Sequence, residues 1–284
     1  MARIKKRWTG TVVLALLCVA MAAGFSCAED CNRGKMLYEK AIKTTDPLKR
    51  IELLRRSRQE CVEFNVLFEL GRAYQKQGDL QQAEEWFKKA GNSQAGEAAR
   101  SRALVGLAGV YERQANIGEA ITRYRQALRL KKYPRVEAHV FQLELENSKH
   151  LVAAEEIVRS LAIHKRAFGV EAGLNLRVGF EYNKAVLNKA GRAQAAQLGE
   201  ALINPEFAEN RFYLLGHTDA RGTEEYNLKL STERAEAVRK FLILNYPLEE
   251  WRLYSEGHGE KDLLYRGDSE DVHRLNRRVE VRVE

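Results

Sequence analysis

Three polar clusters in the last third of the 284-residue chain carry side chains that can recognise a small charged molecule. Gly216-His217-Thr218-Asp219 and Asn276-Arg277-Arg278-Val279 each lie beside a predicted strand, and Ser231 and Arg234 open a predicted helix between them. A planar guanidinium holds a carboxylate through two hydrogen bonds, and a carboxylate accepts hydrogen bonds from an ammonium group. We therefore expect Arg234 and Asp219 to bind the carboxylate and the amine of one zwitterionic ligand.

Two alternatives to this ligand site stay open. Asp219 and Arg234 could form an internal salt bridge, since Ser231 is expected to cap the helix and place Arg234 in its first turn. His217 and His258 could hold a metal ion with Asp219, because imidazole and carboxylate are common metal ligands. Both histidines stand beside glycines in predicted turns, so we expect hydrogen-bonded loop side chains and no metal.

The sequence has no recognisable catalytic or cofactor motif. It contains no GxSxG elbow, no HExxH helix, no Walker loop and no cysteine paired with a base. We expect a binding protein rather than an enzyme, and no cofactor.

Composition and charge narrow the class of protein further. The chain is 45% hydrophobic and 30% charged, which is the balance of folded protein rather than of disorder. The net charge of +8 comes from basic residues that alternate with acidic residues along predicted helices, as on solvated helix faces. We expect no nucleic-acid partner.

Alternating hydrophobicity and helical periodicity after residue 173 predict the elements that position the three clusters. The predicted strands are 174–180, 211–215, 252–255 and 278–283, and the predicted helices are 187–202 and 230–245. This order indicates an α/β sandwich in which helices cover one face of a mixed four-stranded sheet.

The helix between the clusters carries a longer pattern: Asn227-x-x-Leu230-Ser231-x-x-Arg234-Ala235-x-x-Val238-x-x-x-Leu242. Together with the GHTD turn before it and the NRRV strand after it, this pattern resembles the OmpA-like peptidoglycan-binding domain over about residues 174–284. The resemblance implies that Asp219 and Arg234 clasp diaminopimelate, an amino acid of the peptidoglycan stem peptide. It also implies contacts from nearby polar groups and from the rim of the site. These further residues are Thr218, Asn227, Asn276 and Arg278.

One loop departs from the family pattern. The family usually has Phe-Asp-Ser-Ala after its first strand, whereas this chain has Tyr182-Asn183-Lys184-Ala185. Asn183 keeps a hydrogen-bond acceptor without the charge, and Lys184 adds a cation. We expect an altered affinity or preference without a predicted direction.

The first half of the chain is helical by period and repeats itself at a spacing of 37 residues. The recurring positions are Leu70, Gly71, Tyr74, Gly78, Ala83, Phe87 and Ala90, which return as Leu107, Ala108, Tyr111, Ala115, Ala120, Tyr124 and Ala127. Large and small residues alternate between two helices, as tight stacking of helix pairs requires. The pattern resembles the tetratricopeptide repeat from Val66 to Pro134, although a generic helical bundle stays an alternative. Repeats of this kind imply a protein or peptide partner.

The amino terminus reads as a secretory signal. Four basic residues precede an apolar run from Thr11 to Phe25, which is shorter than the roughly 20 residues that span a bilayer. We expect cleavage after Ala28, which lowers the net charge to +4. Lipidation of Cys27 and a retained signal anchor are the alternatives, and the chain would contact a membrane through a lipid if Cys27 is acylated.

Export leaves an even pair of cysteines in an oxidising compartment. We expect a disulfide between Cys31 and Cys61, with two reduced thiols as the alternative. In the loop-entropy model such a bridge contributes about 3 to 4 kcal/mol.

The predicted organisation is a signal peptide at 1–28, helical repeats at 29–150, a helical linker at 151–173 and the OmpA-like domain at 174–284. We expect a wall-associated protein of the periplasm or outer membrane that binds peptidoglycan and holds a protein partner on its repeats. The alternative is a periplasmic interaction scaffold whose OmpA-like domain has lost or altered wall binding. An enzyme acting on peptidoglycan would need a poised acid, base or metal that the sequence does not show.

Overall fold

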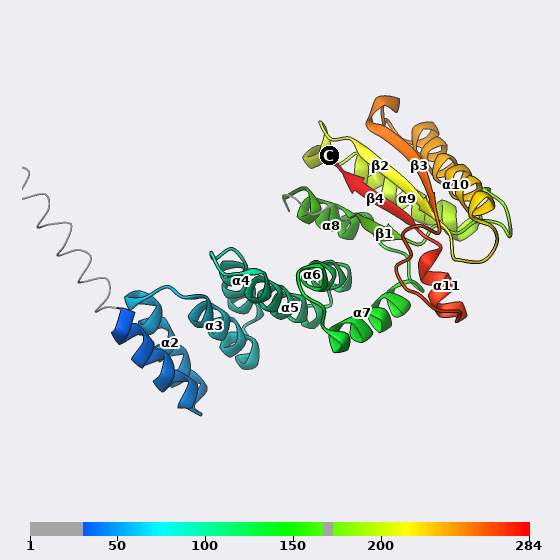
Figure 1. Ribbon diagram of the computed structural model, residues 1–284. Helices are drawn as coiled ribbons and strands as arrows, with labels where there is room; N and C mark the ends of the chain where they lie inside the picture. Colours follow the sequence, from blue (N-terminus) through cyan, green and yellow to red (C-terminus); the bar gives the residue numbers. More distant parts are fainter. Residues whose placement is uncertain (1–30, 167–172) are drawn as a thin grey trace, which may run out of the picture. The chain divides into compact units, whose positions relative to one another are not determined.

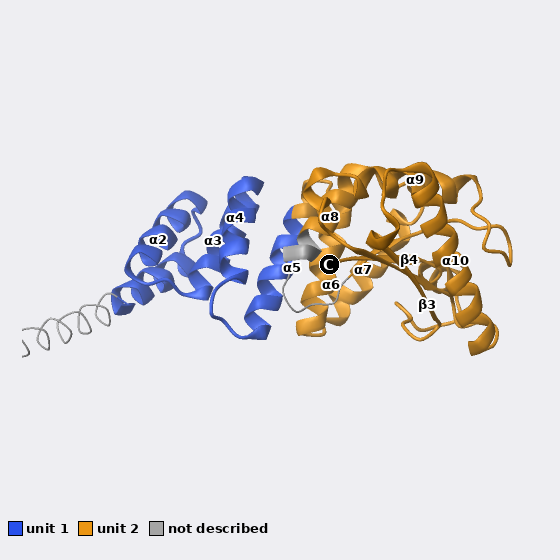
Figure 2. Cartoon of the chain, turned by 90° about the horizontal axis from the view of Figure 1, so that it is seen from above, with its two compact units in different colours: residues 1–110 blue, residues 111–284 orange. Residues whose placement is uncertain are grey.

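The computed structural model describes residues 31–166 and 173–284 (Figure 1). It divides into two compact units, residues 1–110 and 111–284, with the division inside α5 (Glu97–Arg113) (Figure 2). The predicted signal peptide at 1–28, its cleavage and the lipidation of Cys27 lie outside the described residues. Within the described ranges, no helix is both long and apolar enough to cross a membrane.

The described part of the first unit is helical. A helix runs through residues 31–43 and is followed by α2 (Pro47–Glu60), α3 (Phe64–Gln77), α4 (Leu80–Gly91) and the start of α5. Asp46 starts α2 by accepting a hydrogen bond from the Leu48 amide at 2.9 Å, and Pro47 occupies the first turn, where its missing N–H costs nothing. The predicted disulfide between Cys31 and Cys61 is confirmed.

Phe87 on α4 shows why small residues recur in the repeat. Its ring is buried against the backbones of α3 and α5. A Cβ at Gly71 would lie 2.8 Å from this ring, and a Cβ at Gly106 would lie 2.5 Å from it. The two glycines therefore let neighbouring helices approach Phe87 closely, as the alternation of large and small residues predicted.

The second unit continues with helices and ends in a sheet. Its helices are the end of α5, α6 (Ile117–Leu130), α7 (Pro134–Asn147), α8 (Ala154–Arg166), α9 (Lys189–Leu202), α10 (Glu224–Asn245) and α11 (Glu270–Asn276). Its strands are β1 (Leu174–Leu176), β2 (Phe212–His217), β3 (Leu253–Gly259) and β4 (Val279–Val283). The sheet order is β1-β4-β2-β3, with β2 and β3 parallel and the other pairs antiparallel. The predicted fold class, helical repeats followed by a mixed four-stranded α/β sandwich, is confirmed, although the sequence did not reveal α11.

Glycines seat α10 closely on the sheet. A Cβ at Gly216 on β2 would lie 2.2 Å from the Ser231 carbonyl oxygen, and a Cβ at Gly257 on β3 would lie 2.1 Å from the Thr232 hydroxyl. Only glycine permits this approach without displacing backbone. Since Arg234 follows on the same helix, the two glycines determine how far its side chain stands from the loop after β2.

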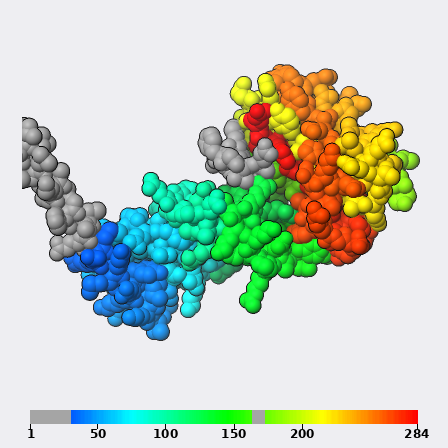
Figure 3. Space-filling view, viewed as in Figure 1, coloured from blue at the N-terminus to red at the C-terminus, as the bar shows by residue number. Residues whose placement is uncertain are grey.

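Helices α7 and α8 pack against the sheet region of the same unit. Ile157 and Leu161 of α8 belong to the core that also contains the strands and α9. The rings of Phe141 and Tyr265 meet edge to face with centroids 4.8 Å apart, and α7 lies beside the segment that carries α11 in the space-filling view (Figure 3). These contacts join residues 111–166 to the sheet. The predicted domain boundaries at 150 and 173 rest on changes in the sequence pattern, and they stay predictions.

Candidate functional site

The start of the loop after β2 is held by hydrogen bonds to its backbone. The Thr218 amide donates to the Gly259 carbonyl at 2.9 Å. The Asn227 side-chain amide donates to the Asp219 carbonyl at 3.3 Å and to the Glu260 carboxylate at 2.6 Å. Asn227 belongs to the family pattern, and its side chain is buried. Its hydrogen bonds orient the loop that carries Asp219.

The Asp219 carboxylate is the anion of the site. It accepts hydrogen bonds from the Arg221 amide at 3.1 Å and from the Arg221 guanidinium at 2.8 Å. A second guanidinium, that of Arg277, donates to its Oδ2 at 2.5 Å. Although burial opposes ionisation, these donors lower the pKa of Asp219 to about 2. The carboxylate is therefore ionised across the physiological pH range.

Arg234 is a cation close enough to this carboxylate to interact with it electrostatically. Its Nε donates to the Lys184 carbonyl at 3.3 Å, and its guanidinium lies 5.1 Å from the centre of the Phe180 ring. Arg234 has no ion pair with any described residue. The internal salt bridge between Asp219 and Arg234, which the sequence left open, is therefore not formed. Burial lowers the pKa of Arg234, and the nearby Asp219 charge acts in the opposite direction.

The predicted start of the helix was wrong. Helix α10 begins at Glu224, and the Thr223 hydroxyl caps it by accepting from the Tyr226 amide at 3.2 Å. Ser231 lies inside the helix, donates to the Leu228 carbonyl and accepts from the Gly259 amide at 2.9 Å. Arg234 is consequently in the third turn, so the helix N-terminal amides do not assist its binding of an anion.

Asn276 and Arg278, predicted as rim contacts, are both buried. The Asn276 side chain exchanges hydrogen bonds with the Tyr265 backbone at 2.8 and 3.2 Å. The Arg278 guanidinium donates to Asn175 Oδ1 at 2.8 Å and to the Asp262 carbonyl at 3.0 Å, and burial lowers its pKa to about 10. These contacts favour roles in shaping the loops, and a direct contact with ligand stays a prediction.

Sequence reasoning missed Arg277 and Arg221, the two arginines that reach Asp219. Arg277 and Arg278 are adjacent where β4 begins, and neighbouring side chains in extended chain point to opposite sides. In the structure Arg277 binds Asp219 and Arg278 is buried. That alternation was the available signal, but it did not say which arginine faces which way.

The loop that departs from the family pattern lies next to Arg234. Asn183 adopts a left-handed backbone conformation with φ 51°, which asparagine tolerates better than most residues. This turn presents the Lys184 carbonyl to Arg234. The Lys184 ammonium bonds instead to Glu181 at 2.8 Å, which raises the pKa of Lys184. Glu181 therefore offsets the added cation locally.

The histidines of the two glycine turns do approach each other. Donor atoms of His217, His258 and Asp262 lie within 4.8 Å of one another, and Asp219 is not part of this group. His217 is buried, which lowers its pKa, whereas the Glu280 carboxylate, 3.4 Å from its Nε2, acts in the opposite direction. The Arg278 guanidinium and the Glu280 carboxylate both lie near His217 and act on its charge in opposite directions. The expectation of no metal stays a prediction.

The fold and the three motifs define a helical-repeat protein with an OmpA-like α/β sandwich, and comparison with known families agrees. The OmpA family model matches residues 179–277, and a tetratricopeptide repeat model matches residues 62–132. The chain therefore carries an OmpA family domain preceded by tetratricopeptide repeats, as the motifs predicted.

Outer membrane proteins and peptidoglycan-associated lipoproteins are similar to about two fifths of this chain or less, and the chain spans less than two thirds of the length of these relatives. The chain is 41% identical over 104 residues to the peptidoglycan-associated lipoprotein of Pseudomonas putida, covering 36% of this chain and 60% of that protein. It is 32% identical over 111 residues to outer membrane porin F of Pseudomonas aeruginosa, covering 39% of this chain and 31% of that protein. Among solved structures, the peptidoglycan-associated lipoprotein from Burkholderia pseudomallei matches with 28% identity and a TM-score of 0.34, over 38% of this chain and 88% of that one.

Proposed function

We propose that residues 174–284 bind peptidoglycan without cleaving it, through the diaminopimelate of the stem peptide. Asp219 takes the ligand amine and Arg234 takes its carboxylate. The observation that carries the proposal is the pairing of an ionised Asp219 with an Arg234 that has no carboxylate partner among the described residues. The names of two relatives support it, since they are peptidoglycan-associated lipoproteins.

A ligand amine can bind Asp219 only by displacing a hydrogen-bond donor that already contacts its carboxylate. An ionised carboxylate offers about four lone-pair sites, and four donors from Arg221 and Arg277 already address those of Asp219. The Arg221 side chain is 57% exposed, and the Arg277 side chain is 31% exposed. The ligand amine therefore replaces Arg221, whose guanidinium can move into solvent. We expect Arg221→Ala to bind diaminopimelate as tightly as wild type or more tightly.

The other predicted contact residues are all buried and differ in whether their side chains already have hydrogen-bond partners. The Thr218 hydroxyl is buried beside Asp219 and has no hydrogen bond, so it is available to a ligand that enters the loop. Asn227, Asn276 and Arg278 are occupied by the chain itself and act as positioning residues.

The repeats supply the second half of the proposed function. Tetratricopeptide repeats precede the OmpA-like domain, and stacked helical repeats usually present a binding surface for a protein or peptide. We infer a wall-bound adaptor of the periplasm or outer membrane that holds a protein partner. The names of the relatives, outer membrane porin F among them, support this location. The alternative function is an interaction scaffold without wall binding.

The proposal is tested by co-sedimentation of the whole chain with purified diaminopimelate-type peptidoglycan. Peptidoglycan with amidated diaminopimelate is the matched control, since amidation removes the carboxylate that Arg234 would hold. We expect binding to the first wall and at least tenfold weaker binding to the second. Equal binding to both would exclude the proposed recognition, and no binding to either would favour the scaffold.

A further inference from the structure

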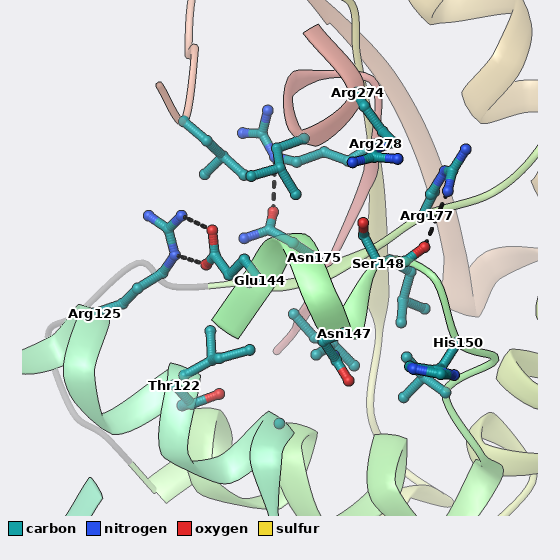
Figure 4. A pocket seen from close by; sticks show the side chains of 18 of the residues that line it. Thr122, Arg125, Glu144, Asn147, Ser148, His150, Asn175, Arg177, Arg274 and Arg278 are labelled. Atoms are coloured by element: carbon teal, nitrogen blue, oxygen red, sulfur yellow. Dashed lines mark hydrogen bonds and ion pairs between the residues drawn. The ribbon is translucent and has the colours of Figure 1, made fainter. Parts of the chain in front are cut away.

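A cavity in the second unit lies between helices α6 and α7 on one side and β1 and α11 on the other (Figure 4). Its empty volume is about 860 Å³, a figure that includes the open solvent at its mouth. Six arginines line it with a single glutamate, Glu144. The arginines are Arg125, Arg129, Arg177, Arg274, Arg277 and Arg278.

The single acid does not balance these charges. Glu144 is bound at both oxygens by Arg125, with Nη2 to Oε2 at 2.6 Å. The charges of Arg125 and Glu144 cancel each other, and the pair lies at one edge of the cavity in Figure 4. Arg278 is buried and occupied by Asn175 and by backbone carbonyls, so it is part of the wall of the cavity.

Two of the remaining arginines have unused hydrogen-bonding capacity. Arg177 donates to the Ser148 carbonyl at 3.0 Å and has no carboxylate partner among the described residues. Arg274 pairs with Asp271 at 2.5 Å, but its Nε is buried without a hydrogen bond. A buried N–H of a charged group without a partner is costly, which points to an acceptor that the chain itself does not provide.

The same arginines repel one another. Burial lowers the pKa of Arg177 first, and the charges of Arg274 and Arg277 lower it further. Arg277 is drawn toward Asp219 and Glu270, which leaves Arg177 and Arg274 to face the cavity together. An anion between them would relieve the repulsion and receive charge-assisted hydrogen bonds.

The rest of the lining mixes polar and aliphatic side chains. Its half-buried aliphatic side chains include Ile121 of α6 and Leu264. In Figure 4, Arg274 and Arg278 lie on the side opposite Thr122 and Asn147. The cavity thus combines a cationic wall with apolar surface, which suits a molecule with an anionic head and an apolar body.

We propose that this cavity binds a small organic anion, a carboxylate or a phosphate carried on an aliphatic body. Arg177 and Arg274 hold the anionic head, and the half-buried Ile121 and Leu264 contact the body. This site goes beyond wall binding, because its head group is held by residues that do not touch Asp219 or Arg234. Since α6 and α7 form one side, the ligand would bridge the helical segment and the sheet within this unit.

Calorimetric titration of the whole chain tests the proposal with three ligands of equal length. Octanoate and octyl phosphate carry the anion, and octanamide has the same body without charge. We expect both anions to bind at least tenfold more tightly than octanamide. Tighter binding of octanoate would identify a carboxylate ligand, and tighter binding of octyl phosphate a phosphate ligand. Equal affinity for octanamide, or no binding of either anion at millimolar concentration, would overturn the proposal.

Three variants locate the head group. Arg177→Gln and Arg274→Gln are each expected to weaken anion binding at least tenfold, with octanamide unaffected. Arg135→Gln, an exposed position on α7 outside the cavity, is the matched control and should bind as wild type does. Wild-type affinity in both Arg177→Gln and Arg274→Gln would refute the assignment. Peptidoglycan co-sedimentation of Arg177→Gln should stay normal, which separates this site from wall binding.

Discussion

Replacing Arg234 by alanine should separate wall binding from stability. Arg234 contributes one hydrogen bond at 3.3 Å and a contact with the Phe180 ring, together worth about 1 kcal/mol or less. Its proposed bond to the ligand carboxylate is a desolvated charge pair, and loss of one partner costs on the order of 2 to 5 kcal/mol. We therefore expect wall affinity to fall at least about 30-fold while unfolding changes little.

Replacing Asp219 by alanine should lower both the affinity for peptidoglycan and the free energy of unfolding. A carboxyl pKa lowered from 3.8 to about 2 corresponds to about 2 kcal/mol of stabilisation. The variant also leaves Arg221 and Arg277 facing each other without an acid between them. Asp219→Ala should therefore lose wall binding like Arg234→Ala and also about 2 kcal/mol of unfolding free energy.

The assay combines co-sedimentation with diaminopimelate-type peptidoglycan and urea denaturation of the same preparations. Lys240→Ala is the matched control, since Lys240 is on α10 and its side chain is 68% exposed. This variant should change neither the affinity for peptidoglycan nor the free energy of unfolding by more than the experimental error. Wild-type wall affinity in Arg234→Ala, or an unfolding loss as large as that of Asp219→Ala, would refute the reasoning.

Three further predictions concern stability. Because the pKa of Asp219 is lower in the folded state, its stabilisation is complete above about pH 4 and is lost as pH falls toward 2; urea denaturation at pH 7, 4 and 2.5 should show this loss, and Asp219→Asn should flatten that part of the profile. Ala115 has φ 60°, which costs a non-glycine residue about 1 kcal/mol, so Ala115→Gly should raise the melting temperature by a few degrees; an unchanged or lower value would count against strain at this turn. Gly106→Ala should lose about 1 to 3 kcal/mol through its clash with the Phe87 ring. The control Gly96→Ala, where a Cβ meets nothing within 4 Å, should be neutral, and equal losses in both variants would contradict the clash.

Much of the fold was predictable because it depends on local pattern. The 37-residue recurrence indicated the repeats, and the even pair Cys31 and Cys61 indicated the disulfide that is present. Strand alternation indicated the sheet, although β1 is shorter than predicted and ends at Leu176. The start of α10 was missed because Ser231 looked like a cap, whereas Thr223 eight residues earlier caps the helix. Serine and threonine both suit the cap position of a helix. Only the packing of α10 on the sheet shows which of the two caps it.

The candidate site was less predictable, because the partners of a charge are chosen in three dimensions. Arg277 and Arg278 are adjacent and chemically identical, yet one bonds to Asp219 and the other is buried against Asn175. The six arginines of the cavity come from residues 125 to 278, and no local pattern brings them together.

The sequence by itself indicated the helical repeats, the order of strands and helices along the chain and the disulfide. It also identified Asp219 and Arg234 as site residues to test. Hydrophobic period, glycine and cysteine carry that information locally. Only the tertiary structure showed that Arg221 and Arg277 already bind Asp219 and that Arg177 and Arg274 line one cavity. It also showed that Arg234 has no carboxylate partner among residues 31–166 and 173–284. Electrostatic energy depends on distance and burial, and both exist only after the chain has packed.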